Sequence, residues 1–347
     1  MLPSTFHALR LPPSHPYTPS SPAPPTALQL LPLPLPTPTT PTTLLIRVHA
    51  TTVIRDNLSW PELYARRPAE PAHMGNDYAG TVVGVHAEAD ARGEWRVGDA
   101  VCGMLGAEKG GAWAEYVLAD CAAGEVGRVP EGLGWGEAAA VPLSGMTGEQ
   151  AVFEHGGLRW GGKQEGERKK RVLVTGAAGG VGMFVVGFAV AAGCEVVGAV
   201  RDEGRDGEFV RELGVAEVIE YADLESGGCG EFDLVIDTVG GEVLRACWGV
   251  VKAEEGARLV SVDSGSWDFV REHGEEGLSK GKEMVKALFF IVEPSAESMR
   301  RVAEAVEKKW IKPLVAREFP FAQAREAYEL VCNRGVSGRG KAVLVME

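Results

Sequence analysis

The chain has 347 residues, of which 45% are apolar and 24% charged, and its formal net charge is −13. This length predicts two domains with sizeable cores, and the composition excludes a chain that is disordered throughout. The acidic charge argues against nucleic-acid binding, which needs a basic surface. Six scattered cysteines without a C-x-x-C pair are typical of reduced thiols in the cytoplasm rather than of disulfides or a zinc cluster.

Short apolar segments separated by proline, glycine and aspartate predict an all-β unit in the first 120 residues. Residues 12–26, rich in proline and serine, are expected to form an exposed loop. The expected strands are 6–11, 27–31, 44–50, 79–85, 100–104 and 114–118, the first two each stopped by proline. Their regular spacing predicts a small barrel or sandwich.

From about residue 138 the apolar pattern changes from strands alone to strands that alternate with helices. A helical region is expected at 138–153, helices at 182–192, 207–213 and 242–251, and strands at 172–175, 195–200, 218–219, 234–237, 258–262 and 287–292. Apolar strands alternating with helices predict a parallel sheet covered on both faces.

The last part of the chain is expected to return to the β-unit. Ser295 is a suitable N-cap for a helix whose core face carries Met299, Val302, Val306 and Trp310. A second helix is expected at 321–331 and a final strand at 341–345. The predicted domains are therefore 1–145, 146–292 and a return at 293–347.

The sequence VLVTGAAGGVG (172–182) joins an apolar strand to a helix through a glycine turn. Glycines here allow a tight turn and let backbone N–H groups approach a pyrophosphate at the positive helix N-terminus. The pattern predicts a nucleotide site at Gly176, Ala178, Gly179, Gly180 and Val181. The 23 uncharged residues from 172 to 194 are long enough to cross a bilayer, but strand, turn and helix explain them better.

The residue after the second strand of this unit bears on the choice of cofactor. NAD-binding units place an acidic residue there to bind the ribose hydroxyl. Here the strand 195–200 is followed by Arg201, whose guanidinium favours the extra phosphate of NADPH. We favour NADPH, while the alternative is that Asp202 binds the ribose and Arg201 lies in solvent.

The chain resembles the zinc-free medium-chain dehydrogenases/reductases of the quinone oxidoreductase and enoyl reductase group, which includes zeta-crystallin. Besides the glycine turn, the matching segments are GNDYAGTVV (75–83), VGDAVCG (97–103), GAWAEYV (111–117), PLSGMTG (142–148), FDLVIDTVG (232–240) and GRGKAVL (338–344). The resemblance implies an α/β chain with a GroES-like β-barrel catalytic domain and a Rossmann domain, which is a doubly wound parallel sheet. It also implies a homodimer and a cofactor held partly by Thr147, Val239, Gly240, Phe290, Ile291 and Lys341.

Zinc-dependent relatives carry a Cys after the 44–50 strand and a Gly-His-Glu motif. Residues 51–56 contain no cysteine, and Asn76 stands where the histidine would be. His73 is close in sequence but is expected to be a surface residue, so we expect no metal site.

Without a Lewis acid, hydride addition to a quinone or an activated double bond is easier to assist than alcohol oxidation. Tyr64 and, less favoured, Tyr78 are candidate proton donors, although either can instead be a packing residue. The predicted function is NADPH-dependent reduction of a small quinone or enone, by a protein that binds no membrane. The alternatives are an accessory enoyl reductase of a polyketide-type pathway and a nucleotide-binding, crystallin-like protein with little turnover.

Overall fold

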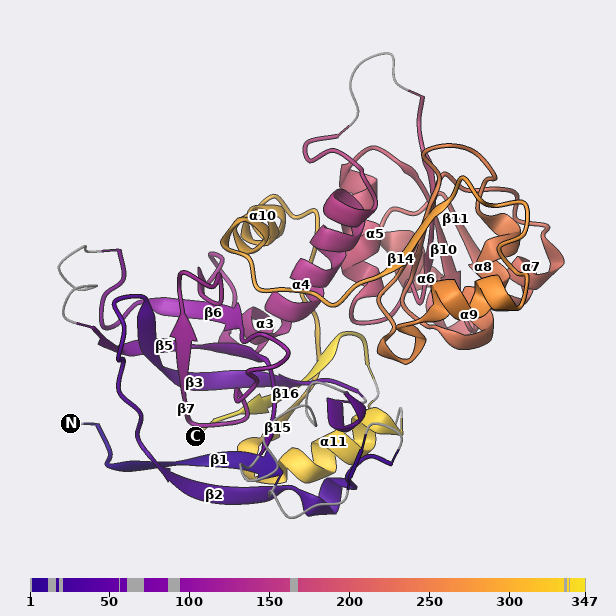
Figure 1. Ribbon diagram of the computed structural model, residues 1–347. Helices are drawn as coiled ribbons and strands as arrows, with labels where there is room; N and C mark the ends of the chain where they lie inside the picture. Colours follow the sequence, from indigo (N-terminus) through magenta and orange to yellow (C-terminus); the bar gives the residue numbers. More distant parts are fainter. Residues whose placement is uncertain are drawn as a thin grey trace. The chain divides into compact units, whose positions relative to one another are not determined.

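The chain forms two compact units, whose elements are labelled in Figure 1. Unit 1 contains Met1–Met146, Glu293–Glu307 and Pro313–Glu347, and unit 2 contains Thr147–Val292 and Lys308–Lys312. The predicted boundaries differ by at most one residue, except that the short segment at 308–312 belongs to unit 2. The computed structural model describes residues 2–11, 17–18, 21–55, 57–60, 72–86, 94–162, 168–333, 336 and 338–346.

The main sheet of unit 1 has the strand order β15-β16-β3-β5-β6-β8, with β7 also paired to β3. Along one edge, β3 pairs first with β7 and then with β16, while β5 occupies its other edge. The predicted β-unit is thus present, with β3 paired to three other strands. The bounds are β3 Thr43–Val53, β5 Asp77–Val85, β6 Ala100–Met104, β7 Tyr116–Asp120, β8 Gly127–Arg128, β15 Val315–Pro320 and β16 Lys341–Val345.

A smaller sheet in unit 1 has the order β2-β1-β4, formed by β1 Thr5–Leu11, β2 Gln29–Pro34 and β4 Ala72–His73. The second strand was expected to stop before Pro32, but it continues through Pro32 and Pro34. The N–H of Leu35 donates to the Ser4 carbonyl (3.0 Å), so the even-numbered residues of β2 direct their nitrogens to the open edge. Proline is tolerated at these positions because a nitrogen that faces the open edge makes no ladder hydrogen bond, so none is lost.

The helices of unit 1 flank the barrel strands. The N–H of Ser298 donates to Ser295 Oγ (3.2 Å), which confirms the predicted cap. The helix ends at Glu307, so Trp310 lies outside it and instead packs on Trp160 in unit 2 (ring centroids 5.4 Å apart). The bounds are α3 Trp135–Ala140, α4 Pro142–Glu149, α10 Ala296–Glu307 and α11 Ala324–Cys332, with 3-10 turns at Pro25–Ala27, Asn57–Ser59 and Phe321–Gln323.

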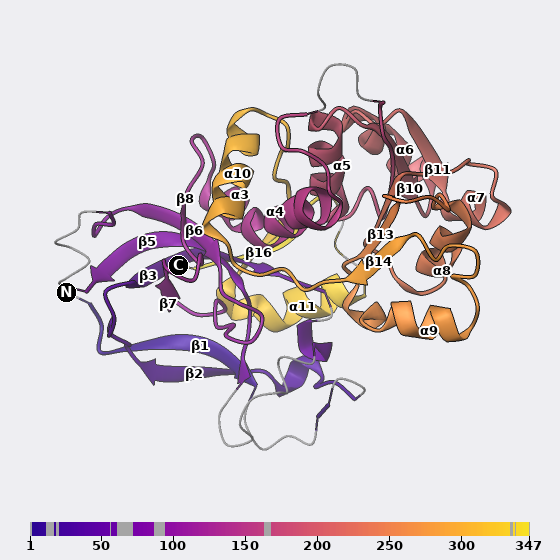
Figure 2. The same cartoon turned by 45° about the horizontal axis from the view of Figure 1, so that its top comes forward.

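Unit 2 is a parallel sheet in the order β11-β10-β9-β12-β13-β14. Figure 2 shows α5 and α6 on one side of this sheet and α8 and α9 on the other. The doubly wound arrangement was predicted, whereas α7 and α9 were not. The bounds are β9 Arg171–Thr175, α5 Gly182–Ala191, β10 Glu195–Val200, α6 Glu203–Glu212, β11 Glu217–Glu220, α7 Tyr221–Ser226, β12 Leu234–Asp237, α8 Gly241–Val250, β13 Arg258–Ser261, the 3-10 turn Ser264–Ser266, α9 Phe269–Glu275 and β14 Lys286–Phe289.

The uncharged stretch from 172 to 194 forms β9, the glycine turn and α5, and eight of the ten α5 residues are buried. Among the residues that the structure describes, no helix is long and apolar enough to cross a membrane.

The helical region expected at 138–153 comprises α3, α4 and a π-helix at Gln150–His155.

A charged cluster holds the amino ends of the unit 2 strands together. The buried carboxylate of Asp233 accepts from Arg168 (Nη1, 3.2 Å), Lys252 Nζ (2.7 Å) and the N–H of Arg171 (2.7 Å). Burial alone would raise the pKa of Asp233, but the hydrogen bonds from Arg168, Lys252 and the Arg171 N–H outweigh it and lower this pKa to about 2. Asp233 therefore stays charged and links β9, β12 and the segment after α8.

We expect Asp233→Asn to lower the free energy of unfolding by roughly 1–3 kcal/mol at pH 7, because charged hydrogen bonds are lost. The folded-state pKa lies below the unfolded value, so this stabilisation is present above about pH 4 and disappears as the pH falls toward 2. Urea unfolding of both proteins at pH 7 and at pH 2.5 measures the difference. A difference that is equally large at both pH values would contradict this role of the Asp233 charge.

Candidate active site

The glycine turn of unit 2 connects β9 to α5 through a backbone that needs glycine at two positions. Gly176 has a φ of +64°, and a Cβ there would lie 2.4 Å from Thr238 Oγ1. A Cβ on Gly182 would lie 2.0 Å from the Gly176 carbonyl oxygen. The turn therefore packs tightly on α5 and on the loop after β12, as a dinucleotide-binding turn requires.

The N-terminus of α5 offers backbone donors to an anion. Its N-cap is Val181, which supplies no side-chain cap. Within the described chain no acceptor is found for the N–H groups of Gly180 and Val181, both of which are partly exposed. Free N–H groups at the positive end of a ten-residue helix are suited to a pyrophosphate.

A buried carboxylate organises the ends of three neighbouring strands at the same edge. Asp237, the last residue of β12, accepts from the hydroxyls of Thr175 on β9 (2.6 Å) and Ser261 on β13 (2.9 Å). It also accepts from the N–H groups of Val239 (3.3 Å) and Gly240 (3.0 Å). Burial raises the pKa of Asp237, and the hydrogen bonds from Thr175 and Ser261 partly offset this effect.

Arg201 follows β10 directly, so it lies at the same carboxyl edge as the glycine turn. Its side chain is exposed, and no hydrogen bond or ion pair to it is found in the described chain. Asp202 has a structural role, because its Oδ1 accepts from the Arg205 N–H (3.0 Å) as the N-cap of α6. Arg201 is thus a cation available to a ligand, whereas the Asp202 carboxylate caps a helix.

The structure gathers most of the predicted cofactor residues at one edge of unit 2, since parallel strands end at the same edge. The glycine turn, Arg201, Val239 and Gly240 follow β9, β10 and β12. Phe290 and Ile291 were expected on the last strand but lie just beyond it, because β14 ends at Phe289. The Phe290 ring packs on His155 (centroids 4.1 Å apart), Ile291 is exposed, and Thr147 is buried in α4.

Three predicted residues belong to unit 1, and the structure gives two of them other roles. Tyr78 is fully buried in the barrel, its hydroxyl donates to the Glu125 carbonyl (2.8 Å), and burial raises its pKa well above the ordinary value. A side chain without exposed surface cannot reach a substrate, which argues against Tyr78 as a proton donor. Lys341, expected near the phosphates, instead places its ammonium 2.7 Å from Asp77 Oδ2. Tyr64 lies outside the described residues.

Asn76, which stands where zinc-dependent relatives have a histidine, has a structural role in this chain. The side-chain amide of Asn76 donates to the carbonyls of Leu105 (3.0 Å) and Gly106 (3.3 Å). Cys102 is fully buried on β6, and burial raises the pKa of its thiol. Within the described residues, no three His, Cys, Asp or Glu side chains are grouped so that they could hold a metal ion.

Sequence reasoning missed Asp237, Thr175 and Ser261, although a common signal was present. Each is a polar, buried residue that ends a strand directly after two or three buried apolar residues. A polar side chain at the end of such a strand needs a partner, and neighbouring parallel strands bring three of them together.

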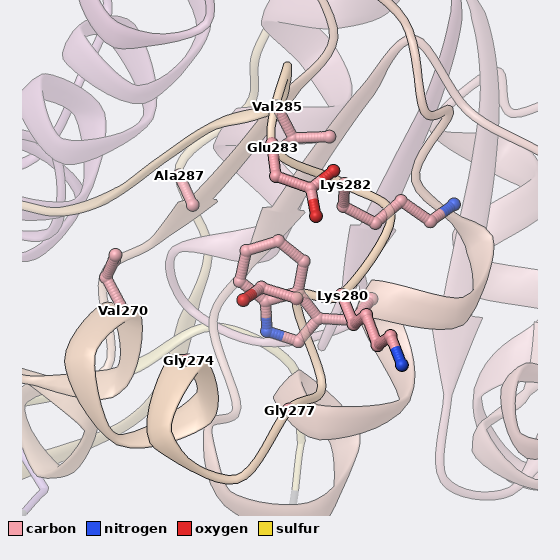
Figure 3. A pocket seen from close by; sticks show the side chains of 10 residues that line it. Val270, Gly274, Gly277, Lys280, Lys282, Glu283, Val285 and Ala287 are labelled. Atoms are coloured by element: carbon pink, nitrogen blue, oxygen red, sulfur yellow. The ribbon is translucent and has the colours of Figure 1, made fainter.

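Unit 2 also has a pocket of about 510 Å³, shown in Figure 3. Its charged groups are already partly engaged: Lys282 Nζ donates to the Val251 carbonyl, and the Glu283 carboxylate accepts from the Gly281 N–H (2.9 Å). The pocket is bounded by α8, α9 and the segment that leads into the amino end of β14, so it lies away from the carboxyl edge. It is lined by Trp248, Val270, Gly274, Gly277, Ser279, Lys280, Lys282, Glu283, Val285 and Ala287.

Two family models match the chain: the alcohol dehydrogenase GroES-like domain at residues 40–131 and the zinc-binding dehydrogenase model at residues 213–344. A probable mitochondrial zinc-binding oxidoreductase of Arthroderma benhamiae is 34% identical over 308 residues, which cover 86% of this chain and 87% of the relative. The chain belongs to the medium-chain dehydrogenase/reductase family.

Within this family the chain falls in the quinone oxidoreductase group. Human quinone oxidoreductase is 27% identical over 321 residues, covering 87% of this chain and 89% of the relative. The solved quinone oxidoreductase of Coxiella burnetii superposes with a TM-score of 0.78 at 23% identity, covering 99% of this chain and all of that one. The predicted GroES-like domain and Rossmann-like sheet are thereby confirmed as the fold of this medium-chain dehydrogenase/reductase. The cytoplasmic location stays a prediction.

Proposed function

We propose that this chain is an NADPH-dependent, zinc-free oxidoreductase that reduces quinones or activated carbon–carbon double bonds. The observation that carries the proposal is the carboxyl edge of unit 2. There, N–H groups at the start of α5 and the Arg201 guanidinium, for which the described residues supply no partner, follow adjacent strands of one parallel sheet. Pyrophosphate and 2′-phosphate are anions that these two groups suit.

The residues of unit 2 would hold the cofactor in three ways. The glycine turn admits a pyrophosphate close to the backbone, Arg201 supplies a guanidinium for a 2′-phosphate, and the loop at Val239 and Gly240 borders the same edge. A bound reduced nicotinamide supplies the hydride, and the protein supplies orientation.

The zinc-free assignment is supported by Asn76, which stands where zinc-dependent relatives have a histidine. Its side-chain amide is committed to two backbone carbonyls. Without a Lewis acid, acceptors that are already electrophilic are favoured over alcohols. A quinone or an enone accepts a hydride, and the resulting anion is protonated by solvent or by a side chain.

We expect NADPH oxidation, followed at 340 nm, with members of a panel of quinones and enones. A chelator should leave the rate unchanged, and elemental analysis should find well under one zinc per chain. Tight NADPH binding without turnover on any acceptor would favour the crystallin-like alternative. Stoichiometric zinc together with alcohol oxidation would overturn the proposal.

The preference for NADPH is tested by Arg201→Ala. Loss of a charged contact to the 2′-phosphate should cost roughly 1.5–3 kcal/mol, or about ten- to a hundred-fold in the KM for NADPH. The KM for NADH should change little, because NADH lacks this phosphate. Arg211→Ala is the matched control, since it removes an exposed guanidinium of α6 that pairs with Glu203. Equal effects of Arg201→Ala on both cofactors would instead favour Asp202 as the ribose ligand.

A homodimer formed along β14 completes the proposal. In the described chain β14 pairs only with β13, so it leaves an open sheet edge. The residues before and after β14 in the sequence include four exposed apolar side chains, namely Trp267, Val270, Met284 and Ile291. A second copy would cover an edge and apolar surface that monomers rarely expose. Sedimentation equilibrium should therefore give twice the chain mass of 36.9 kDa, and a monomer mass at micromolar concentration would contradict the dimer.

A further inference from the structure

We propose that Asp237 is a positioning residue for the dinucleotide, because its carboxylate fixes the peptide groups that border the cofactor edge of unit 2. This inference rests on the proposed nicotinamide cofactor. Asp237 lies within the matching segment 232–240, directly before the loop Thr238–Gly240, but neither the motif nor the resemblance gave it a role.

Four backbone N–H groups are directed at this one carboxylate, two directly and two through a hydroxyl. Val239 and Gly240 donate to it themselves. The N–H of Thr238 donates to Thr175 Oγ1 (3.1 Å), and that hydroxyl donates to Asp237. In the same way, the N–H of Asp263 donates to Ser261 Oγ (3.3 Å), which donates to Asp237. The loops after β12 and β13 are thus fixed by a single charge.

The same bonds decide which groups of the loop face away from the carboxylate. Because a trans peptide is planar, an N–H that points toward Asp237 turns the carbonyl of its peptide the opposite way. The carbonyl oxygens of Thr238 and Val239 are therefore directed away from Asp237. In the part of the chain that the structure describes, no hydrogen bond to either oxygen is found. These acceptors are available to the hydrogen-bond donors of a bound dinucleotide.

The loop is also coupled to the glycine turn. Thr238 Oγ1 donates to the Thr175 carbonyl (2.9 Å), directly before Gly176. There is no room for a Cβ between Gly176 and Thr238, so a shift of one segment displaces the other. A disturbance at Asp237 therefore reaches the pyrophosphate turn through direct contacts.

Only a carboxylate at position 237 can accept all four of these hydrogen bonds; a polar side chain of the same size that carries a donor cannot. Within the described residues no Lys or Arg contacts Asp237, so N–H and O–H dipoles alone balance its charge. An asparagine would present an NH₂ group to the N–H of either Val239 or Gly240. Hydroxyl groups can rotate to accept such a donor, but a backbone N–H cannot. Asp237→Asn must therefore move the loop.

The matched control is Asp233→Asn, which changes a second buried carboxylate at the other end of the same strand. We expect Asp237→Asn to raise the Kd for NADPH, and for NADH, by about tenfold or more, as expected when a charged hydrogen bond is lost. Asp233→Asn should lower Tm and leave both Kd values unchanged. Isothermal titration calorimetry and thermal unfolding of the full chain measure both quantities.

A second pair of variants keeps the test independent of the folding of Asp237→Asn. Thr175→Val retains the shape but removes the hydroxyl that links Thr238 to Asp237, and Thr175→Ser keeps the hydroxyl. Thr175→Val should weaken NADPH binding, and Thr175→Ser should bind NADPH nearly as tightly as the wild-type chain. Unchanged affinity in Asp237→Asn and Thr175→Val, or equal weakening by Asp233→Asn, would overturn the positioning role. A wild-type chain that binds neither NADPH nor NADH would instead overturn the proposed function on which this role rests.

Discussion

Three parallel strands in unit 2 end with polar side chains at positions where little water can reach them. The carboxylate of Asp237 meets this constraint, since it accepts from Thr175 on β9 and Ser261 on β13. β9 and β12 are adjacent in the sheet, and the chain order reverses between them. Ligands of doubly wound sheets bind at such a reversal. The interaction that satisfies the buried strand ends thus also shapes the place where a ligand is expected.

The two ends of β12 show how charge can be buried in different ways. Asp233 at the amino end pairs with the cations Arg168 and Lys252, and its pKa is lowered to about 2. Among the described residues, Asp237 at the carboxyl end accepts from neutral donors alone, and burial raises its pKa. Ion pairs suit an end of the sheet that only has to hold strands together. At the carboxyl end the donors are hydroxyls and backbone N–H groups of the strands and loops that border the expected ligand edge, so the carboxylate fixes these loops.

Unit 1 solves a similar problem in the barrel. The buried Asp77 carboxylate accepts from Thr52 Oγ1 (2.6 Å), the Leu143 N–H (2.6 Å) and Lys341 Nζ (2.7 Å). These contacts join β3, β5, β16 and the start of α4. The neighbouring Asn76 holds the backbone at Leu105 and Gly106. The segment that resembles a metal-binding motif in related enzymes therefore supports the barrel in this chain.

Much of the architecture could be predicted because its signals are local. The ranges 100–104, 195–200, 234–237 and 341–345 coincide with β6, β10, β12 and β16, since apolar runs bounded by turn residues mark strands. The short helices α7 and α9 were missed. Each has only six or seven residues and few buried positions, so its apolar period is too short to detect. Trp310 continued a helical pattern in sequence, but its tertiary contact with Trp160 places it in unit 2.

By itself, the sequence determined the strand, glycine turn and helix at 172–191 and the cation at Arg201, because each depends on neighbours along the chain. Only the tertiary structure decided how Tyr78, Lys341 and Asp237 are used. Tyr78 and Lys341 look like reactive groups in sequence, but their partners Glu125 and Asp77 occupy other strands or loops. Asp237 looks like the end of a strand, and its side-chain hydrogen bonds come from residues 62 positions earlier and 24 positions later. Hydrogen bonds between distant segments form only when the sheet brings them together, so no local pattern encodes them.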